Sequence, residues 1–200
     1  MDDIRATCAT INPFIIACTE TWFSDKKHCE TDSSICNYVC VRDDRTNRIG
    51  GGVALWIKSG TSFERLSSHP TPTSIEYVFL SIPTLKLLFM CIYIPPQQPA
   101  DSACNINNFV INTCDHFFNQ LNDFNLCICA DFNRFDISSL CATFDLIDFD
   151  SPPTLGNARL DRFLISADLA RRCEIIINIG PPIDTTNSAY YSTLWYVFTS

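Results

Sequence analysis

Acidic and amide side chains stand directly after two strongly apolar segments of this 200-residue sequence, and their types suit metal and phosphate chemistry. Asp131 and Asn133 follow the apolar run 126–130, and Glu20 follows the run 14–18. Aspartate and asparagine disfavour strand interiors and favour turns, so these side chains should project from the carboxyl edge of a sheet, where α/β proteins gather their binding groups. Carboxylates there suit Mg²⁺ or Mn²⁺, and an Asp-x-Asn pair can accept a proton from water and hydrogen-bond a phosphate.

Two further polar residues border apolar runs in a similar way. Tyr93 ends the run 87–92 and is followed two residues later by a pair of prolines, and Asp161 precedes the run 163–165. If these runs are strands, four polar side chains of complementary chemistry stand at strand ends in one chain. Such convergence is the criterion for a candidate site.

A purely structural interpretation stays open for each candidate. Asp131 and Asn133 can form an Asx turn, in which both side chains bond only nearby backbone. Glu20 can be a surface residue at a helix start, and Tyr93 a strand aromatic whose hydroxyl reaches the surface. Asp161 has an arginine on each side within two residues, and a plain ion pair would explain it.

The four signatures, in this order, resemble the endonuclease/exonuclease/phosphatase superfamily, and specifically the endonuclease domain of non-LTR retrotransposons. The resemblance extends over residues 11–188, and the segments 19–22, 48–55 and 180–183 are also similar to the retrotransposon branch. It implies a DNase I-like fold, a four-layer α/β/β/α sandwich of two mixed sheets with the site at one end. It also implies a divalent-metal-dependent phosphodiester hydrolase that nicks duplex DNA, with a reverse transcriptase region downstream in the intact element.

The same resemblance implies a role for each candidate residue. Glu20 would bind the divalent ion, Mg²⁺ or Mn²⁺. Asp131 and Asn133 would handle the attacking water and the phosphate, and Tyr93 would contact the phosphate. Asp161 would orient a catalytic histidine near the carboxyl end.

The chain departs from the family pattern in two places. In the family a histidine preceded by an aspartate follows the Gly-Pro-Pro-Ile segment, but Ser188 and Asn187 stand at those positions here. The histidines of the chain are His28, His69 and His116, so none follows residue 116. The opening strand of the family, which carries an asparagine, is also missing, so we interpret residues 1–200 as a single domain that is incomplete at its amino end.

Loss of a general acid or base costs a rate factor of about 10² to 10⁴. We therefore expect a nuclease whose activity is weakened or lost. Two alternatives stay open: a degenerate domain that folds and binds DNA or metal without turnover, and a phosphatase of the same fold that acts on lipid or nucleotide phosphates.

Composition favours a folded domain outside the secretory pathway. With 46% hydrophobic and 12% aromatic residues, 200 residues can bury a sizeable core, and one domain is the default. The amino end shows no leader, and the longest apolar runs have the length of strands, so we expect a soluble protein of the nucleus or cytoplasm. The twelve cysteines form no Cys-x-x-Cys pair, and several lie inside apolar runs, which favours buried thiols over zinc or disulfides.

The net charge of -8 argues against DNA binding, because affinity for the phosphate backbone depends on clustered lysine and arginine. Two local groups of arginines weaken that objection. One group is Arg42, Arg45 and Arg48, and the other is Arg159, Arg162, Arg171 and Arg172. We favour ordinary solvated faces over a DNA-binding track for both groups.

The pattern of apolar residues predicts strands separated by turns, with two helices. The helices are expected over 1–12 and from Asp101 or Ser102, either of which would cap the helix, to about residue 121. The strands are expected at 14–18, 38–41, 51–57, 75–82, 85–94, 126–130, 163–165 and 173–178. Residues 81–85 read as a hairpin link, and the tail 190–198 either completes the second sheet or is an unpaired edge.

Overall fold

The computed structural model describes residues 2–23, 33–46, 50–67, 70–72, 74–96, 100–133, 135–149, 153, 159–171, 173–182 and 191–199. Within them the chain forms two β-sheets. The five-stranded sheet has the order β10-β11-β1-β3-β2 and comprises β1 (Ile15–Thr19), β2 (Tyr38–Asp43), β3 (Val53–Lys58), β10 (Cys173–Pro182) and β11 (Tyr191–Thr199). All of its pairings are antiparallel.

The six-stranded sheet has the order β4-β5-β6-β7-β9-β8. It comprises β4 (Glu64–Arg65), β5 (Glu76–Ile82), β6 (Leu87–Tyr93), β7 (Asn125–Asp131), β8 (Leu146–Phe149) and β9 (Asp161–Ser166). This sheet is mixed, because β6 and β7 run parallel while the other pairs are antiparallel. The helices are α1 (Asp2–Ile11), α3 (Ala100–Gln120), α4 (Ser138–Phe144) and α5 (Ala167–Ala170).

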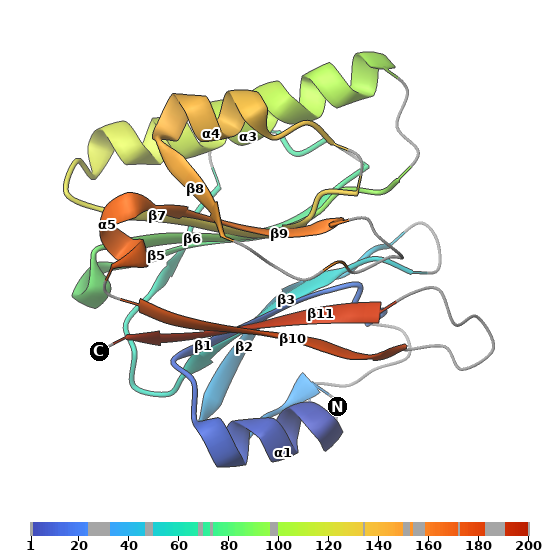
Figure 1. Cartoon of the computed structure of the whole chain (residues 1–200), viewed down its shortest axis with the longest axis vertical. Coiled ribbons are helices and arrows are strands. Elements are labelled where there is room, and N and C mark those ends of the chain that lie inside the picture. The colour runs from blue at the N-terminus through green and yellow to red at the C-terminus, as the bar shows by residue number, and fades with distance from the viewer. Residues whose placement is uncertain are drawn as a thin grey trace.

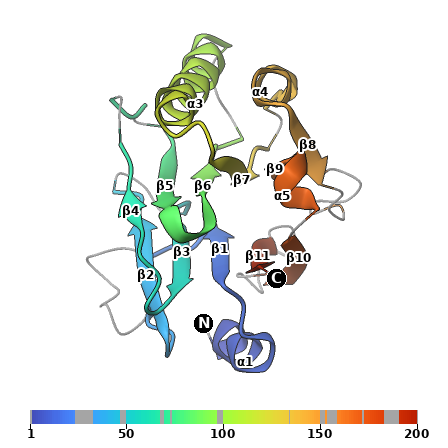
Figure 2. The same ribbon diagram turned by 90° about the vertical axis from the view of Figure 1, so that its left-hand side faces the viewer.

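The two sheets pack face to face and helices cover their outer faces, which gives four layers (Figures 1 and 2). Three hydrophobic clusters fill the three interfaces. One, with Phe89 and Phe163, lies between the sheets. A second joins α3 and α4 to the six-stranded sheet, and a third joins Ile4 and Cys8 of α1 to Trp56 and other residues of the five-stranded sheet. The expected α/β/β/α sandwich is therefore confirmed, with one of the two sheets antiparallel rather than mixed.

The parallel pair of β6 and β7 explains why a long helix lies between them in the chain. Antiparallel strands can be joined by a short turn, but parallel strands need a crossover connection. Helix α3 is this crossover, and its residues Ile106, Val110 and Cys114 are buried against the six-stranded sheet. The crossover brings the ends of β6 and β7 to the same edge.

Most of the expected elements are present, with differences at their ends. Helix α3 begins at Ala100, so Asp101 and Ser102 lie within it rather than capping it. The link after β5 is a hairpin connection, a short 3-10 turn over Pro83–Leu85. The tail forms β11, which lies between β10 and β1, so the interpretation as an unpaired edge is wrong.

Sequence patterns did not indicate β4, β8, α4 or α5. These elements span 2, 4, 7 and 4 residues, which is too short for a periodic pattern to be distinguished from a loop. Strand β8 lies at the edge of its sheet, and only its first residue, Leu146, is buried. The short elements therefore depend on the long ones against which they pack.

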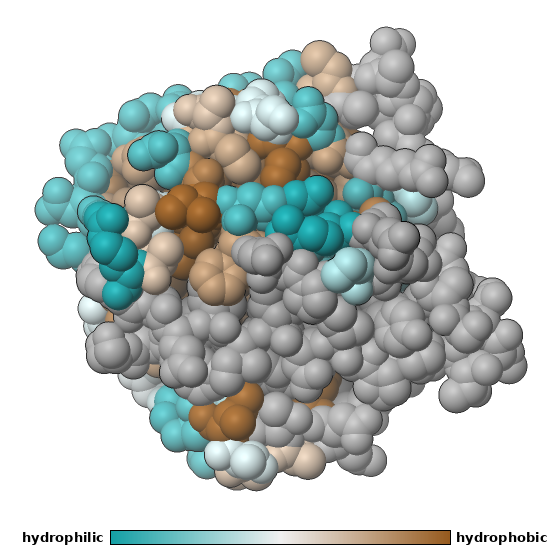
Figure 3. Space-filling view, viewed as in Figure 1, coloured by the Kyte–Doolittle hydropathy of each residue, from teal (hydrophilic) through white to brown (hydrophobic). Residues whose placement is uncertain are grey.

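The expected buried thiols are present. Cys18, Cys91 and Cys129 are free cysteines inside strands and are at most 5% exposed. A thiol in that setting acts as a small apolar side chain. On the visible face of the α3 and α4 layer, hydrophilic and apolar residues are interspersed (Figure 3). None of the helices in the described ranges is long and apolar enough to cross a membrane.

Candidate functional site

A row of polar residues crosses one end of the six-stranded sheet. The strand register pairs Glu76 of β5 with Tyr93 of β6, Tyr93 with Asp131 of β7, and Asp131 with Asp161 of β9. Residues paired in register point to the same face of a sheet. Tyr93 belongs to the cluster between the sheets, so this row faces the five-stranded sheet. The register therefore places Tyr93, Asp131 and Asp161 side by side at one end of the sheet.

Glu20 reaches the same place from the opposite sheet. It follows β1 and adopts a left-handed backbone conformation, with φ 54°. Its Oε2 accepts hydrogen bonds from the indole Nε1 of Trp22 and from the backbone N–H of Gly51, both at 2.8 Å. The negative charge of Glu20 is among the causes that raise the pKa of the Tyr93 hydroxyl, so the two groups lie near each other. The site thus lies where the ends of β1 and of the six-stranded sheet meet.

Arg45 and Glu76 form a buried ion pair beside Tyr93, and sequence analysis did not single out either residue for the site. The guanidinium of Arg45 donates to both carboxylate oxygens of Glu76 at 2.6 Å, and the two side chains are 9% and 8% exposed. The Arg45 Cζ lies 4.9 Å from the centroid of the Tyr93 ring. A Cβ on Gly51 would come within 2.5 Å of that Cζ, so the glycine makes room for the arginine.

Glu76 could have been identified from the sequence because it is an acid at the end of an otherwise apolar strand. A buried carboxylate requires a partner, because an isolated charge is costly to remove from water. Arg65 and Lys86 are nearer to Glu76 in the sequence than Arg45 is, so the sequence alone did not identify the partner. The interpretation of the arginine-containing loop before the glycines as an ordinary solvated face is wrong for Arg45.

Asp131 and Asn133 make the turn that the structural interpretation predicts. The backbone N–H of Asn133 donates to Asp131 Oδ1 at 3.0 Å, and Asn133 Nδ2 donates to the carbonyl of Ile94 at 2.7 Å. Asn133 has φ 51°, in the region that asparagine tolerates better than most residues. These bonds fix the direction of the Asp131 carboxylate and tie the ends of β6 and β7 together, so one turn both shapes the strand end and orients the acid.

Burial, and after it the nearness of like charges, sets the electrostatics of the site. Removal from water raises the pKa of Asp131 well above the usual aspartate value, the charges of Asp161 and Glu20 raise it further, and the hydrogen bonds from Asn133 oppose this. The pKa of Tyr93 is also raised, first by burial and then by Glu20 and Asp131. Burial raises the pKa of Cys18 beneath the site, with contributions from Cys91, Asp161 and Glu20. The convergent carboxylates therefore act on one another.

Asp161 is 5% exposed and lies at the end of β9. The arginines on either side of it, Arg159 and Arg162, both bind the carboxylate of Asp148 on the neighbouring strand β8. Arg171 binds Asp168. Arg159 and Arg162 are partly buried in their ion pairs, so the expectation of a merely solvated face does not describe them. Arg171 is 71% exposed and does lie on a solvated face. Arg48 and Arg172 lie outside the described residues.

The donor set at the strand ends suits a hard divalent cation. Oxygen ligands are the ones that Mg²⁺ and Mn²⁺ prefer, and the mutual repulsion of Glu20, Asp131 and Asp161 is the kind of excess charge that such an ion relieves. Within the described ranges no three His, Cys, Asp or Glu side chains form a ready-made metal cluster. The arrangement therefore fits an ion held by one or two carboxylates and completed by water or substrate, rather than a closed protein cage.

The residues that replace the family histidine, Asn187 and Ser188, lie outside the described residues, as do His28 and His69. His116 lies exposed on α3, beside Phe117 and Gln120. Because α3 covers the outer face of the six-stranded sheet, His116 is separated from the strand-end row by that sheet. It does not supply the missing side chain.

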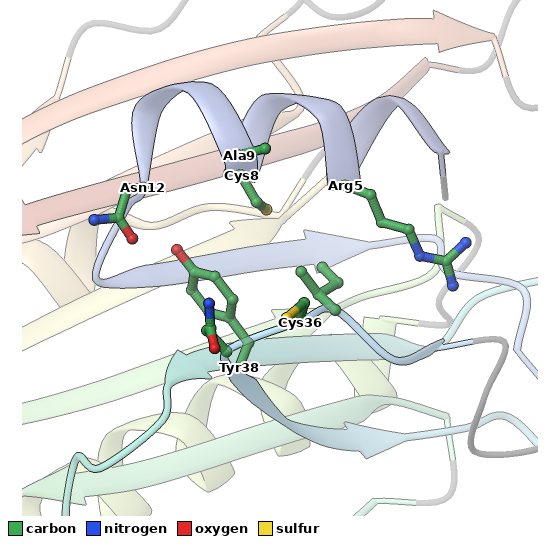
Figure 4. Close-up of a pocket in the computed structure, with 8 residues that line it drawn as sticks. Arg5, Cys8, Ala9, Asn12, Cys36 and Tyr38 are labelled. Carbon is green, nitrogen blue, oxygen red and sulfur yellow. The ribbon is translucent and has the colours of Figure 1, made fainter.

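A separate cavity of about 480 Å³ lies between α1 and the segment that leads into β2 (Figure 4). Arg5, Cys8 and Tyr38 are among its lining residues, and the Tyr38 hydroxyl donates to the carbonyl of Pro13 at 2.6 Å. Tyr38 is at the end of β2 that pairs with Lys58, whereas Glu20 follows the opposite end of the sheet. This cavity is therefore not part of the strand-end site.

No protein-family model and no curated protein matches the sequence. Solved structures do resemble the chain. The human nocturnin catalytic domain with bound sulfate is 11% identical, with a TM-score of 0.64, covering 98% of this chain and 84% of that one. The endonuclease domain of TRAS1, a telomere-specific non-LTR retrotransposon, is 12% identical, with a TM-score of 0.62 and coverage of 98% and 91%. An AP endonuclease from Archaeoglobus fulgidus is 14% identical, with a TM-score of 0.60 and coverage of 96% and 91%.

These similarities establish the fold. The chain has the DNase I-like architecture found in the endonuclease/exonuclease/phosphatase superfamily, of which the three proteins above are representatives. At identities of 11% to 14%, nothing finer follows from them.

The raised pKa of Asp131 gives a prediction for the variant Asp131→Asn. The folded protein holds the Asp131 proton to a higher pH than the unfolded chain does, so between pH 3.8 and the folded pKa the folded state binds more protons. Its free energy of unfolding therefore falls as the pH rises through this interval. Asparagine keeps the acceptor for the Asn133 N–H and removes the charge. We expect the variant to be about 0.5–2 kcal/mol more stable than the wild type at neutral pH. The difference should vanish in acid.

Urea unfolding at several pH values measures this, with Asp115→Asn on the exposed side of α3 as the control. The control should follow the wild-type pH profile. A variant at position 131 that is no more stable than the wild type at neutral pH would contradict the electrostatic assignment.

Proposed function

We propose that the strand-end site is a phosphodiester site of the DNA-nicking endonuclease type, dependent on a divalent metal ion, in which turnover is weakened or lost. The observation that carries this proposal is the convergence of Glu20 from one sheet with Tyr93, Asp131 and Asp161 from the other. Hydrolysis of a phosphodiester needs a proton acceptor for water, donors for the phosphate oxygens, and positive charge near the leaving oxygen. The site offers the first two from its own side chains.

Asp131 is the proton acceptor in this proposal. Its carboxylate is held by the Asn133 N–H, and its pKa is raised, which brings its affinity for a proton closer to that needed near neutral pH. The second N–H of the Asn133 side-chain amide and the Tyr93 hydroxyl are donors for phosphate oxygens. Arg45, stacked on the Tyr93 ring, fixes the position of that hydroxyl.

Glu20, with Asp131 and Asp161 nearby, would hold the metal ion, Mg²⁺ or Mn²⁺. When bound, the ion supplies positive charge to the phosphate and the leaving oxygen. Hydrogen bonds from Trp22 and Gly51 both go to Oε2 of Glu20. They orient the carboxylate, as the partners of metal-binding carboxylates commonly do.

Weak turnover follows from the sequence rather than from the strand-end geometry. Ser188 and Asn187 stand where the family resemblance expects histidine and aspartate, and the chain has no histidine after residue 116. A serine hydroxyl cannot exchange a proton near neutral pH as an imidazole can. The similarity to the TRAS1 endonuclease domain and to an AP endonuclease supports DNA as the substrate class.

Calorimetric titration with Mn²⁺ tests the metal site. We expect the wild type to bind Mn²⁺ and Glu20→Gln to bind it about tenfold or more weakly, because the amide keeps the hydrogen-bond acceptor but removes the anionic ligand. Glu64→Gln, a change at an exposed carboxylate of β4, should have no effect. Binding that is absent in the wild type, or equal in Glu20→Gln, would refute the metal site.

A plasmid-nicking assay with Mg²⁺ tests the reaction. The wild type should nick slowly or not at all, and the double variant Asn187→Asp/Ser188→His should nick about 10² times faster or more, because it restores a proton-transfer group. Adding Glu20→Gln to the double variant should abolish that gain. Rapid nicking by the wild type that is unaffected by Glu20→Gln would contradict the proposal, as would a double variant without any gain over the wild type.

A further inference from the structure

An exposed tryptophan, Trp22, lies beside the candidate metal ligand Glu20. Trp22 is 40% exposed and is two residues beyond Glu20, whereas Trp56 is completely buried. The indole Nε1 donates to Glu20 Oε2, so the polar edge of the ring is turned toward the site. Neither the proposed proton transfer nor the proposed metal ion uses the face of this ring.

Trp22 is held firmly in its exposed position. Its backbone N–H donates to the carbonyl of Gly51 at 2.9 Å, and its own φ is 55°, a conformation that bulky residues rarely adopt. The ring lies close to Gly50, where a Cβ would be 3.7 Å from the indole Cε2. The next residue, Phe23, packs edge to face against Trp56 with centroids 6.5 Å apart. The exposure of Trp22 is therefore imposed by ordered neighbours on both sides.

The charges around the site favour contact with nucleic acid through an aromatic ring rather than through phosphate groups. The net charge is -8, and two arginines in the described part of the chain near the site are engaged with acids, Arg45 with Glu76 and Arg42 with Asp44. Capture of nucleic acid through phosphate contacts is correspondingly weak. Stacking of a base on an aromatic ring does not depend on net charge and accepts any base, because each has a π-face.

We propose that Trp22 is a stacking surface for a nucleobase of single-stranded DNA whose adjacent phosphate occupies the Glu20 site. The inference rests on the proposed function and names the substrate class, because a lipid or sugar phosphate has no base to stack. A base can stack on Trp22 only where it is not stacked on its neighbours, as in a single strand or at a frayed or locally opened point of a duplex. Trp22 then selects nucleic acid, while the strand-end row acts on its phosphate.

The test measures by fluorescence anisotropy, in Mg²⁺, how tightly the protein binds two fluorescein-labelled 12-nucleotide probes. One probe is oligothymidylate, and the other is an oligomer of equal charge with abasic residues at its centre. The wild type should bind the thymidylate at least about fivefold more tightly than the abasic probe. Trp22→Ala should bind both probes with equal affinity. Loss of the indole bond to Glu20 affects both probes alike, so the ratio of the two affinities is the readout. Trp22→Phe should keep most of the preference, because it retains a ring but loses the N–H bond to Glu20.

Ile147→Ala, which removes a residue 46% exposed on β8, is the matched control and should keep the preference. Mn²⁺ titration of each variant separates the two proposals. Suppose first that Glu20-dependent Mn²⁺ binding is intact. The stacking inference is then overturned, and the metal site stands, if the wild type binds both probes equally or binds neither, or if Trp22→Ala keeps the preference for thymidylate. If Mn²⁺ binding is also absent from the wild type, both are overturned.

Discussion

Crowding of like charges at the end of two packed sheets is the constraint that explains the local structure around the site. Strand register pairs Asp131 with Asp161, and the packing of the two sheets brings Glu20 near them, so that burial and the charges of Asp161 and Glu20 raise the pKa of Asp131. Folding tolerates this because Glu20 and Asp131 are held by donors of fixed geometry. Backbone and indole N–H groups bind Glu20, and the Asn133 N–H binds Asp131. The positive φ angles of Trp22, Gly51 and Asn133 place those donors.

The Arg45–Glu76 ion pair holds the acid on the next strand of the row, β5. Glu76 would be a further negative charge in the row, but its two hydrogen bonds with Arg45 neutralise it and bring a cation against the ring of Tyr93. Breaking a buried pair of this kind is costly because it leaves one charge uncompensated. The pair thus separates a structural carboxylate from the acids available for a cation, and it makes Arg45 a positioning residue rather than a DNA contact.

Much of the sandwich could be predicted from the sequence because its strands are long and apolar, and because polar residues mark their ends. Glu20, Tyr93, Asp131 and Asp161 were found in this way, since each borders an apolar run. Arg45 and Glu76 were not, because an ion pair between residues 31 apart depends on the packing of the two sheets and leaves no local pattern. The same holds for the pairing of the arginines around Asp161 with Asp148. The exposure of Trp22 depends on its neighbours and has no sequence signal of its own.

The convergence of carboxylates is tested most directly by measuring the titration of Asp131 itself. Carbon-13 NMR of the aspartate carboxyl groups, recorded against pH for the wild type and for Asp161→Asn, reports the Asp131 midpoint in each. We predict a wild-type midpoint well above 3.8 that falls when the charge at position 161 is removed. An Asp131 that titrates near 3.8 in both proteins would show that these acids do not share one site, and would contradict the account.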